Sequence, residues 1–312
     1  MPNAISLKDY AQRDAHGLAE LVAKKAVTPK ELALTALKAI ETVDKDIYAV
    51  CEVYHDRIGG LDEASLGQGP FRGVPFLIKD VFGHIKGRKI EYASRLCEGM
   101  VADADTYFYK QLCAAGLNVV GRTRTPEYSM AGTAESALYG NSSNPWKKGY
   151  STGGSSGGAQ AAVTAGIVPV AHGSDIGGSI RIPASYCGGV GLKPSRGRVS
   201  IGPVVDEGGL GFSTNMMQTM TVRDAAAMLD WVSVPQVGDP FIIPKPAESY
   251  VSLARKAAPK LKIGLHLSAL LGITPDPEVV AAVKATAKTL ESMGHTIVDV
   301  SPDFGGPAAI KE

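Results

Sequence analysis

The sequence contains little that could form a disulfide-stabilised domain or bind a metal. Its four cysteines, Cys51, Cys97, Cys113 and Cys187, are widely spaced and form no CxxC pair. We therefore expect free thiols in a reducing compartment rather than a disulfide framework or a zinc site. The six histidines form no HxxxH or HExxH pair. The sequence thus predicts neither a metal site nor a cofactor.

The sequence also lacks an excess of charge of either sign and a long apolar run. It has 32 basic and 31 acidic residues and a net charge of +1, which gives no electrostatic support for nucleic-acid binding. No apolar run approaches the roughly 18 residues of a membrane span. Charged residues interrupt the apolar runs of the first 27 residues, so no signal peptide is predicted. We expect a cytoplasmic protein of undetermined oligomeric state.

What the chain does contain is an alternation of helical and strand-like segments. The first 43 residues show helical periodicity from Ala15 on, with a second helix capped by Thr28 and begun by Pro29. Apolar runs predict buried strands at 74–78, 118–121 and 167–171. Further helices are predicted at 106–115, 158–165 and 277–293. This alternation predicts an α/β fold with a mixed central sheet flanked by helices on both faces.

Two glycine-serine loops lie close together, GGSSGG at 153–158 and GSDIGGSIRIPAS at 173–185. A flexible linker is disfavoured because the flanking segments are a strand-like run and an alanine-rich helix, both apolar. A phosphate-binding loop would need GxxxxGK[ST] or GxGxxG, which are absent here. The first loop matches the GxSxG nucleophile elbow, but a polar segment broken by Pro145 precedes it instead of a buried strand. All three interpretations are weak.

The remaining interpretation of the two loops is a catalytic site that uses serine and lysine but no histidine. An amide carbonyl requires a nucleophile, a base for its proton, and donors for the oxyanion. Lysine can be that base only when it is neutral, and burial favours the neutral form. Lys79 ends an apolar run, where a lysine could be buried. From position alone, however, a surface pair of Lys79 and Asp80 is the favoured interpretation.

Several motifs together resemble the amidase signature family. They are GVPFLIKD (73–80), GRTRTPE (121–127), NPW (144–146), GGSSGG and the segment 173–200 that begins GSDIGGSIRIPAS. The resemblance is strong over 73–200 and weaker on both sides. Family members use a Ser–cis-Ser–Lys triad. The resemblance implies that Lys79 is the base, Ser155 the relay serine with a cis peptide bond, and Ser179 the nucleophile.

The second loop is also expected to supply the oxyanion hole. Ile176, Gly177 and Gly178, followed by Ser179, offer consecutive backbone N–H groups, and glycine allows a carbonyl to approach the backbone closely.

Further residues are expected to support or line the site. Asp175 and Arg181 should hold the second loop by hydrogen bonds, with an ordinary exposed ion pair as the alternative. Ser156 should have a supporting role and point away from the reacting atom. The resemblance places Ser129 and Met130 in the acyl pocket.

The sequence departs from the family in two places, Thr152 and its length, and from the amidotransferase subgroup in a third, Ile182. Thr152 stands where many members have proline, and Ile182 stands where amidotransferase subunits commonly have glutamine. Similar enzymes also extend well past the position of Glu312. We therefore expect one amidase-signature domain over 1–312 that lacks the usual C-terminal portion and part of the pocket wall.

The resemblance implies a hydrolase that cleaves carbon–nitrogen amide bonds through an acyl-enzyme. The expected substrate is a small-molecule amide or carbamate, and ester hydrolysis is compatible with the same chemistry. Two alternatives stay open. One is an amidotransferase subunit that works on misacylated tRNA with partner proteins, which Ile182 disfavours. The other is an inactive or fragmentary homologue.

Overall fold

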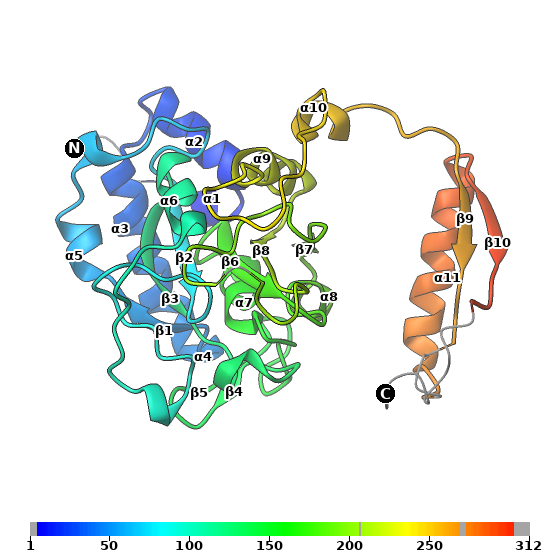
Figure 1. Cartoon of the computed structure of the whole chain (residues 1–312), viewed down its shortest axis with the longest axis horizontal. Helices are drawn as coiled ribbons and strands as arrows, with labels where there is room; N and C mark the ends of the chain where they lie inside the picture. Colours follow the sequence, from blue (N-terminus) through cyan, green and yellow to red (C-terminus); the bar gives the residue numbers. More distant parts are fainter. Residues whose placement is uncertain (1–4, 206, 269–272, 303–312) are drawn as a thin grey trace. The chain divides into compact units, whose positions relative to one another are not determined.

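The computed structural model describes residues 5–205, 207–268 and 273–302, and the chain divides into two compact units, 1–255 and 256–312. A six-stranded mixed sheet forms the centre of the first unit (Figure 1), in the order β1-β3-β2-β6-β8-β7. The middle strands β3, β2 and β6 are parallel, and the remaining pairings are antiparallel. The strands are β1 Val50–Val53, β2 Pro75–Lys79, β3 Asn118–Thr123, β6 Val170–Asp175, β7 Val190–Gly191 and β8 Thr214–Thr219. The predicted α/β fold with a mixed sheet and surrounding helices is confirmed.

Short helices surround this sheet, and a two-stranded hairpin, β4 Glu135–Ser136 with β5 Gly140–Asn141, lies outside it. The helices are α1 Leu7–Ala11, α2 Ala15–Ala23, α3 Pro29–Ala39, α4 Lys45–Ile47, α5 His55–Gly59, α6 Tyr107–Ala114, α7 Gly157–Thr164, α8 Arg181–Cys187, α9 Val222–Val232 and α10 Tyr250–Ala254. The predicted start of α3 is confirmed, since Thr28 and Glu31 form a capping box. The Pro-rich segment 233–249 contains no helix or strand.

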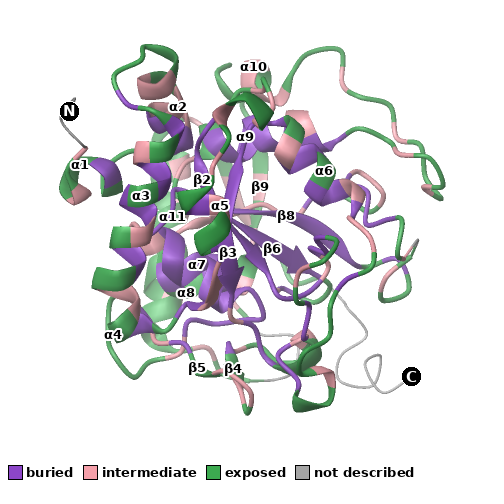
Figure 2. Ribbon diagram, turned by 90° about the vertical axis from the view of Figure 1, so that its left-hand side faces the viewer, coloured by how far each residue is buried: buried purple, intermediate pink, exposed green. Residues whose placement is uncertain are grey.

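The core of the first unit lies in the central strands (Figure 2), and every residue of β2, β3, β6 and β8 is buried. Helix α7, of sequence GGAQAAVT, packs on this sheet, against β6 above all. Its glycine and alanine residues let the helix axis come close to the strands. The packing therefore brings the loop before α7 to the carboxyl ends of β2 and β6.

The sequence prediction omitted strands β1, β4, β5, β7 and β8 and placed the start of β6 too early. β6 begins at Val170 rather than at residue 167 and continues through the buried polar residues His172, Ser174 and Asp175. β8 was not predicted, because Thr214 and Asn215 are polar although both are buried. Hydrophobic patterning finds strands by their apolar side chains, so it misses strands that bury polar ones.

The second unit contains a β–α–β segment. Its elements are β9 Lys262–Leu265, α11 Pro277–Ser292 and β10 Thr296–Asp299. The two strands are parallel, with Thr296 opposite Lys262, and the predicted helix at 277–293 is present. In the described part of the chain, no helix combines the length and the apolar character that a membrane span requires.

Candidate active site

Lys79 lies at the carboxyl end of β2 and is fully buried, as is its neighbour Asp80. Successive side chains of a strand point to opposite faces, and these two separate accordingly. Lys79 extends toward the glycine-serine loops, and Asp80 pairs with Arg122. The surface pair that position alone favoured is therefore wrong.

Three serine hydroxyls surround the Lys79 amino group. Its Nζ donates to Ser155 Oγ at 2.7 Å, to Ser156 Oγ at 2.9 Å and to Ser174 Oγ at 2.9 Å. Burial lowers the pKa of Lys79 from 10.5 to about 7, although the negative charge of Asp175 partly opposes the shift. Near neutral pH a large fraction of Lys79 is therefore uncharged and able to accept a proton.

Close packing of the first loop accounts for its glycines. A Cβ atom on Gly154 would lie 1.9 Å from the carbonyl oxygen of Thr133, so no other residue fits there. The Gly154–Ser155 peptide bond is cis. Thr125 Oγ1 donates to the carbonyl of Ser155 at 3.0 Å and fixes the loop from the other side. Thr125 lies in the GRTRTPE motif, but sequence reasoning gave it no role.

Ser156 connects the two loops. Its backbone N–H donates to the carbonyl of Ser179 at 3.2 Å, and its hydroxyl donates to the carbonyl of Ser174 at 3.2 Å. The same hydroxyl contacts Lys79, so Ser156 is closer to the predicted base than the sequence suggested. Ser174, the third hydroxyl on Lys79, was not predicted. It lies in the polar half of β6 that the sequence prediction omitted.

Asp175 organises the second loop. Its carboxylate accepts the backbone N–H groups of Gly178 at 2.8 Å and Ile180 at 3.1 Å, and a bidentate pair from Arg181 at 3.0 and 2.9 Å. Burial alone would raise the pKa of Asp175, but these hydrogen bonds outweigh it and hold the pKa below its ordinary value. Asp175 is fully buried and the Arg181 side chain half exposed, so the pair differs from an ordinary exposed ion pair.

The backbone of the second loop turns sharply at Gly178, which has a φ of +132°. Ile176 and Gly177 are exposed and Ser179 is half-buried. Among the described residues, the N–H groups of these three have no hydrogen-bond partner, whereas that of Gly178 is bound to Asp175. In the described structure the loop thus has three backbone N–H groups available as donors, those of Ile176, Gly177 and Ser179.

The two predicted pocket residues lie on a neighbouring turn. Ser129 has a positive φ of +59°, and its hydroxyl is 3.0 Å from Thr125 Oγ1. Because Thr125 also holds the Ser155 carbonyl, this turn is connected to the first loop. Met130 is 84% exposed.

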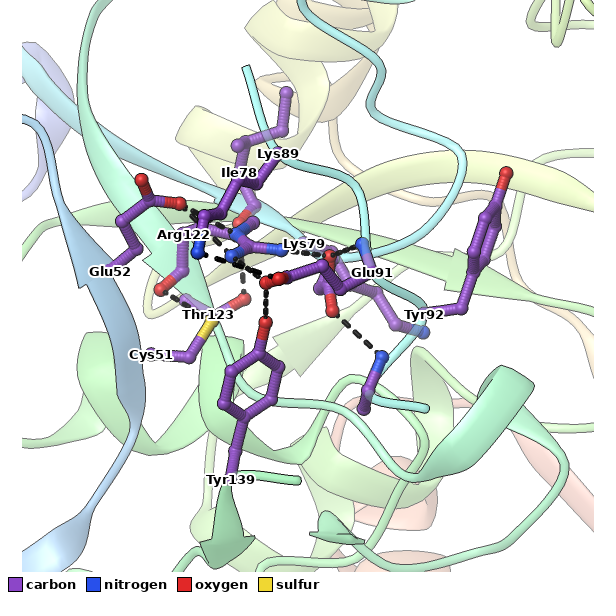
Figure 3. A network of polar contacts seen from close by, with 12 residues as sticks. Cys51, Glu52, Ile78, Lys79, Lys89, Glu91, Tyr92, Arg122, Thr123 and Tyr139 are labelled. Atoms are coloured by element: carbon purple, nitrogen blue, oxygen red, sulfur yellow. Dashed lines mark hydrogen bonds and ion pairs between the residues drawn. The ribbon is translucent and has the colours of Figure 1, made fainter. Parts of the chain in front are cut away.

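Arg122 of β3 lies at the centre of a network of buried charges that sequence reasoning did not identify (Figure 3). It pairs with Asp80, with Glu52 at 3.0 Å and with Glu91 at 2.7 Å, and Glu91 also accepts from Tyr139. Asp80 further accepts the backbone N–H groups of Glu91 and Ala93, each at 2.8 Å. The network thus ties the segment that follows Lys79 to the sheet.

Replacing Arg122 with methionine should lower the free energy of unfolding by about 3–5 kcal/mol, because buried Asp80 and Glu91 would lose their cation. Urea unfolding measures the change. Exposed Arg95 provides the control, since Arg95→Met should cost well under about 1 kcal/mol. Equal stabilities of the two variants would show that the network contributes nothing.

One group of side chains in the first unit has the geometry of metal ligands: Asp14, His16 and Asp224. All three already have protein partners. Asp14 caps α2 and pairs with Arg223, and Asp224 accepts from His16 Nδ1 and from the Ala15 N–H. These contacts are typical of helix ends that pack together, so the cluster gives no support for a metal.

Comparison with known proteins identifies close relatives. The family model "Amidase" matches residues 31–304. The chain is 38% identical over 301 residues to a 6-aminohexanoate-cyclic-dimer hydrolase of Paenarthrobacter ureafaciens, a match that covers 94% of this chain and 60% of that protein. It is 37% identical over 286 residues to a glutamyl-tRNA(Gln) amidotransferase component of Synechococcus sp. (strain CC9311), covering 88% of this chain and 58% of that one.

A solved structure of 6-aminohexanoate cyclic dimer hydrolase matches with a TM-score of 0.88 and 36% identity, over 96% of this chain and 62% of that one. The chain spans about three fifths of the length of these relatives. Fold, family model and sequence identity agree, and the chain belongs to the amidase signature family.

Proposed function

We propose that the protein hydrolyses carbon–nitrogen amide bonds, with Ser179 as nucleophile and Lys79 as base. One observation carries the proposal: Lys79 is fully buried, and its Nζ lies 2.7 Å from the hydroxyl of Ser155. A buried lysine with a pKa of about 7 is suited to general-base catalysis near neutral pH. Family membership supports the same chemistry.

In the proposed reaction a proton moves from Ser179 Oγ to Ser155 Oγ while the Ser155 proton moves to neutral Lys79 Nζ. Ser179 Oγ then bonds to the carbonyl carbon, and the carbonyl oxygen becomes an oxyanion. Collapse of this intermediate breaks the C–N bond, and the proton on Lys79 returns through Ser155 to the leaving amine. Water hydrolyses the acyl-enzyme by the same relay. The Ser155 and Ser179 hydroxyls are not hydrogen-bonded among the described residues, so this relay contact would form when substrate binds.

The oxyanion is proposed to bind the backbone N–H groups of Ile176, Gly177 and Ser179, whose donors are free of other partners in the described structure. Gly178, predicted as a further donor, uses its N–H for Asp175. We therefore propose that Gly178 shapes the hole through Asp175. Loss of one such donor typically costs about 10²–10³-fold in rate.

The proposed substrate is a small amide with an uncharged acyl group. Ile176, three residues before Ser179, and Met130, next to Ser129, have exposed apolar side chains. Ile182 lies where a Cβ on Gly153 or Gly178 would touch it. The relative named for a cyclic amide dimer agrees with such a substrate. A hydrolysis screen over amides, carbamates and esters of graded size tests the proposal. Amide turnover is expected, and its complete absence would contradict the proposal.

The amidotransferase role is the second candidate, since a relative with that name is almost as similar. Apolar Ile182 at the second loop favours a hydrolase that acts alone. Glutamine-dependent activity that appears only with partner proteins would favour the amidotransferase.

The rate of amide hydrolysis should rise with pH through an apparent pKa of about 7, because only uncharged Lys79 accepts a proton. kcat/KM measured from about pH 5.5 to 9.5 tests this expectation. A flat profile would contradict it.

The stability of the protein should also depend on pH through Lys79. Lys79 has its ordinary pKa of 10.5 in the unfolded state, so between about pH 7 and 10.5 the unfolded state binds more protons than the folded state. The free energy of unfolding should therefore rise with pH over this window, whereas below about pH 7 the contribution of Lys79 is constant.

A further inference from the structure

The pairing of β2 with β6 ends before Lys79. Phe76 pairs with Val170 and Leu77 with Ala171, but β2 continues on its other side as far as Lys79, opposite Thr123 of β3. The Lys79 N–H therefore lacks a backbone acceptor on β6. It donates instead to the imidazole Nδ1 of His172 at 3.3 Å. At Lys79, the proposed base, a hydrogen bond to a side chain thus takes the place of a backbone hydrogen bond between β2 and β6.

The surroundings of His172 fix which nitrogen carries the proton. Its Nε2 lies 3.1 Å from Asn215 Oδ1, and the amide nitrogen of Asn215 donates to the carbonyl of Phe82 at 3.4 Å. An amide oxygen only accepts, so Nε2 carries the hydrogen and Nδ1 is the acceptor that the Lys79 N–H requires. The chain of contacts joins β2, β6 and β8.

The imidazole is held tightly in place. It is fully buried, and its ring centroid lies 4.9 Å from that of Phe108 on α6. A Cβ atom on Gly83 would come within 2.9 Å of Nδ1, so the segment after β2 packs directly on the ring. His172 therefore has little freedom to release Lys79 by moving.

We propose that His172 is a positioning residue that holds the end of β2 at the place where Lys79 Nζ reaches Ser155 and Ser174. Its imidazole accepts the Lys79 N–H where β2 and β6 separate, and the separation leaves room for three hydroxyls around Nζ. The catalytic importance of this placement rests on the function proposed above. The placement itself is a property of the fold.

His172 performs this role as a neutral group. Burial lowers its pKa to about 3, although Asn215 acts in the opposite direction, and the charges of Lys79 and His84 lower it further. The charged group that acts on Lys79 is Asp175. Over the working pH range the imidazole therefore adds no charge, and Lys79 is the group that titrates.

The test is the pKa of Lys79 in His172→Phe, which keeps a ring against Phe108 but leaves the Lys79 N–H without an acceptor. The end of β2 should shift toward water, and better solvation should raise the pKa of Lys79 by at least about one unit. NMR titration of protein with ¹³C-labelled lysine, assigned with Lys79→Ala, measures this without relying on catalysis. kcat near pH 7 should fall roughly 10–100-fold with little change in KM.

A conservative variant and a stability control complete the experiment. His172→Asn places an amide oxygen near the position of Nδ1 and should keep the pKa of Lys79 close to the wild-type value. His16→Phe removes the imidazole that pairs with buried Asp224; it should lower stability without moving the Lys79 titration. A pKa that stays at the wild-type value in His172→Phe, or moves equally in His172→Asn, would overturn the proposal.

His172→Leu tests the same contact in case His172→Phe does not fold. Leucine is close to the imidazole in volume and has no acceptor for the Lys79 N–H. The pKa of Lys79 should rise here also, and an unchanged value would overturn the proposal. Failure of the proposed function looks different: Lys79 would titrate as expected in wild type, but no amide would be hydrolysed.

Discussion

Replacing Ser179 with alanine is expected to lower amide hydrolysis by about 10⁵–10⁶-fold, since the variant lacks the oxygen that bonds to the carbonyl carbon. The fold should be unaffected. Ser179 is half-buried, and its contact with Ser156 uses the backbone carbonyl, which alanine retains. kcat for an amide identified in the substrate screen, together with thermal unfolding, measures both effects.

Ser185 is the matched control, because it is an exposed serine of helix α8 in the same segment. Ser185→Ala should hydrolyse the substrate within about twofold of wild type, as expected of a surface substitution. Substantial activity in Ser179→Ala would assign the nucleophile to another residue.

Replacing Lys79 with methionine is expected to lower kcat by about 10³-fold or more while the protein stays folded. Methionine has a similar length, so it fills the same space without an ionisable group. The substitution also removes the cost of burying a charge, although three serine hydroxyls lose their partner. The unfolding temperature should therefore change little, and the rise of activity with pH near 7 should disappear.

Lys148→Met is the comparison, because Lys148 is exposed and pairs with Asp46 on the surface. It should have wild-type activity and an unchanged pH profile. If Lys79→Met kept near-normal turnover, Lys79 would be a structural residue, and another group would have to accept the proton.

The sequence predicted the parts of the fold that follow simple patterns. Thr28 and Pro29 indicated the start of α3, and the apolar run at 74–78 indicated β2. The polar half of β6 and all of β8 were missed, because they bury His172, Ser174 and Asn215 through hydrogen bonds that no periodicity reveals. Of the strands beside the candidate site, β2 was thus predicted, whereas β6 was predicted only in part and β8 not at all.

The candidate site followed from motif resemblance rather than from residue chemistry. Position alone favoured a surface location for Lys79, since burial of a strand end depends on what covers it. Ser155 and Ser179 lie on two loops that a backbone hydrogen bond joins. The partners of Lys79 in β6 and the Asp80–Arg122 contact join residues far apart in sequence, so only the folded chain reveals them.

The attacking serine is the central claim, and the position of a covalent adduct tests it most directly. The protein would be labelled with a fluorophosphonate, and the modified peptide located by mass spectrometry in wild type, Ser155→Ala and Ser179→Ala. We predict an adduct on Ser179, which forms slowly at the same position in Ser155→Ala and is absent in Ser179→Ala. An adduct on Ser155 that persists in Ser179→Ala would contradict the account and make the first loop the nucleophile loop.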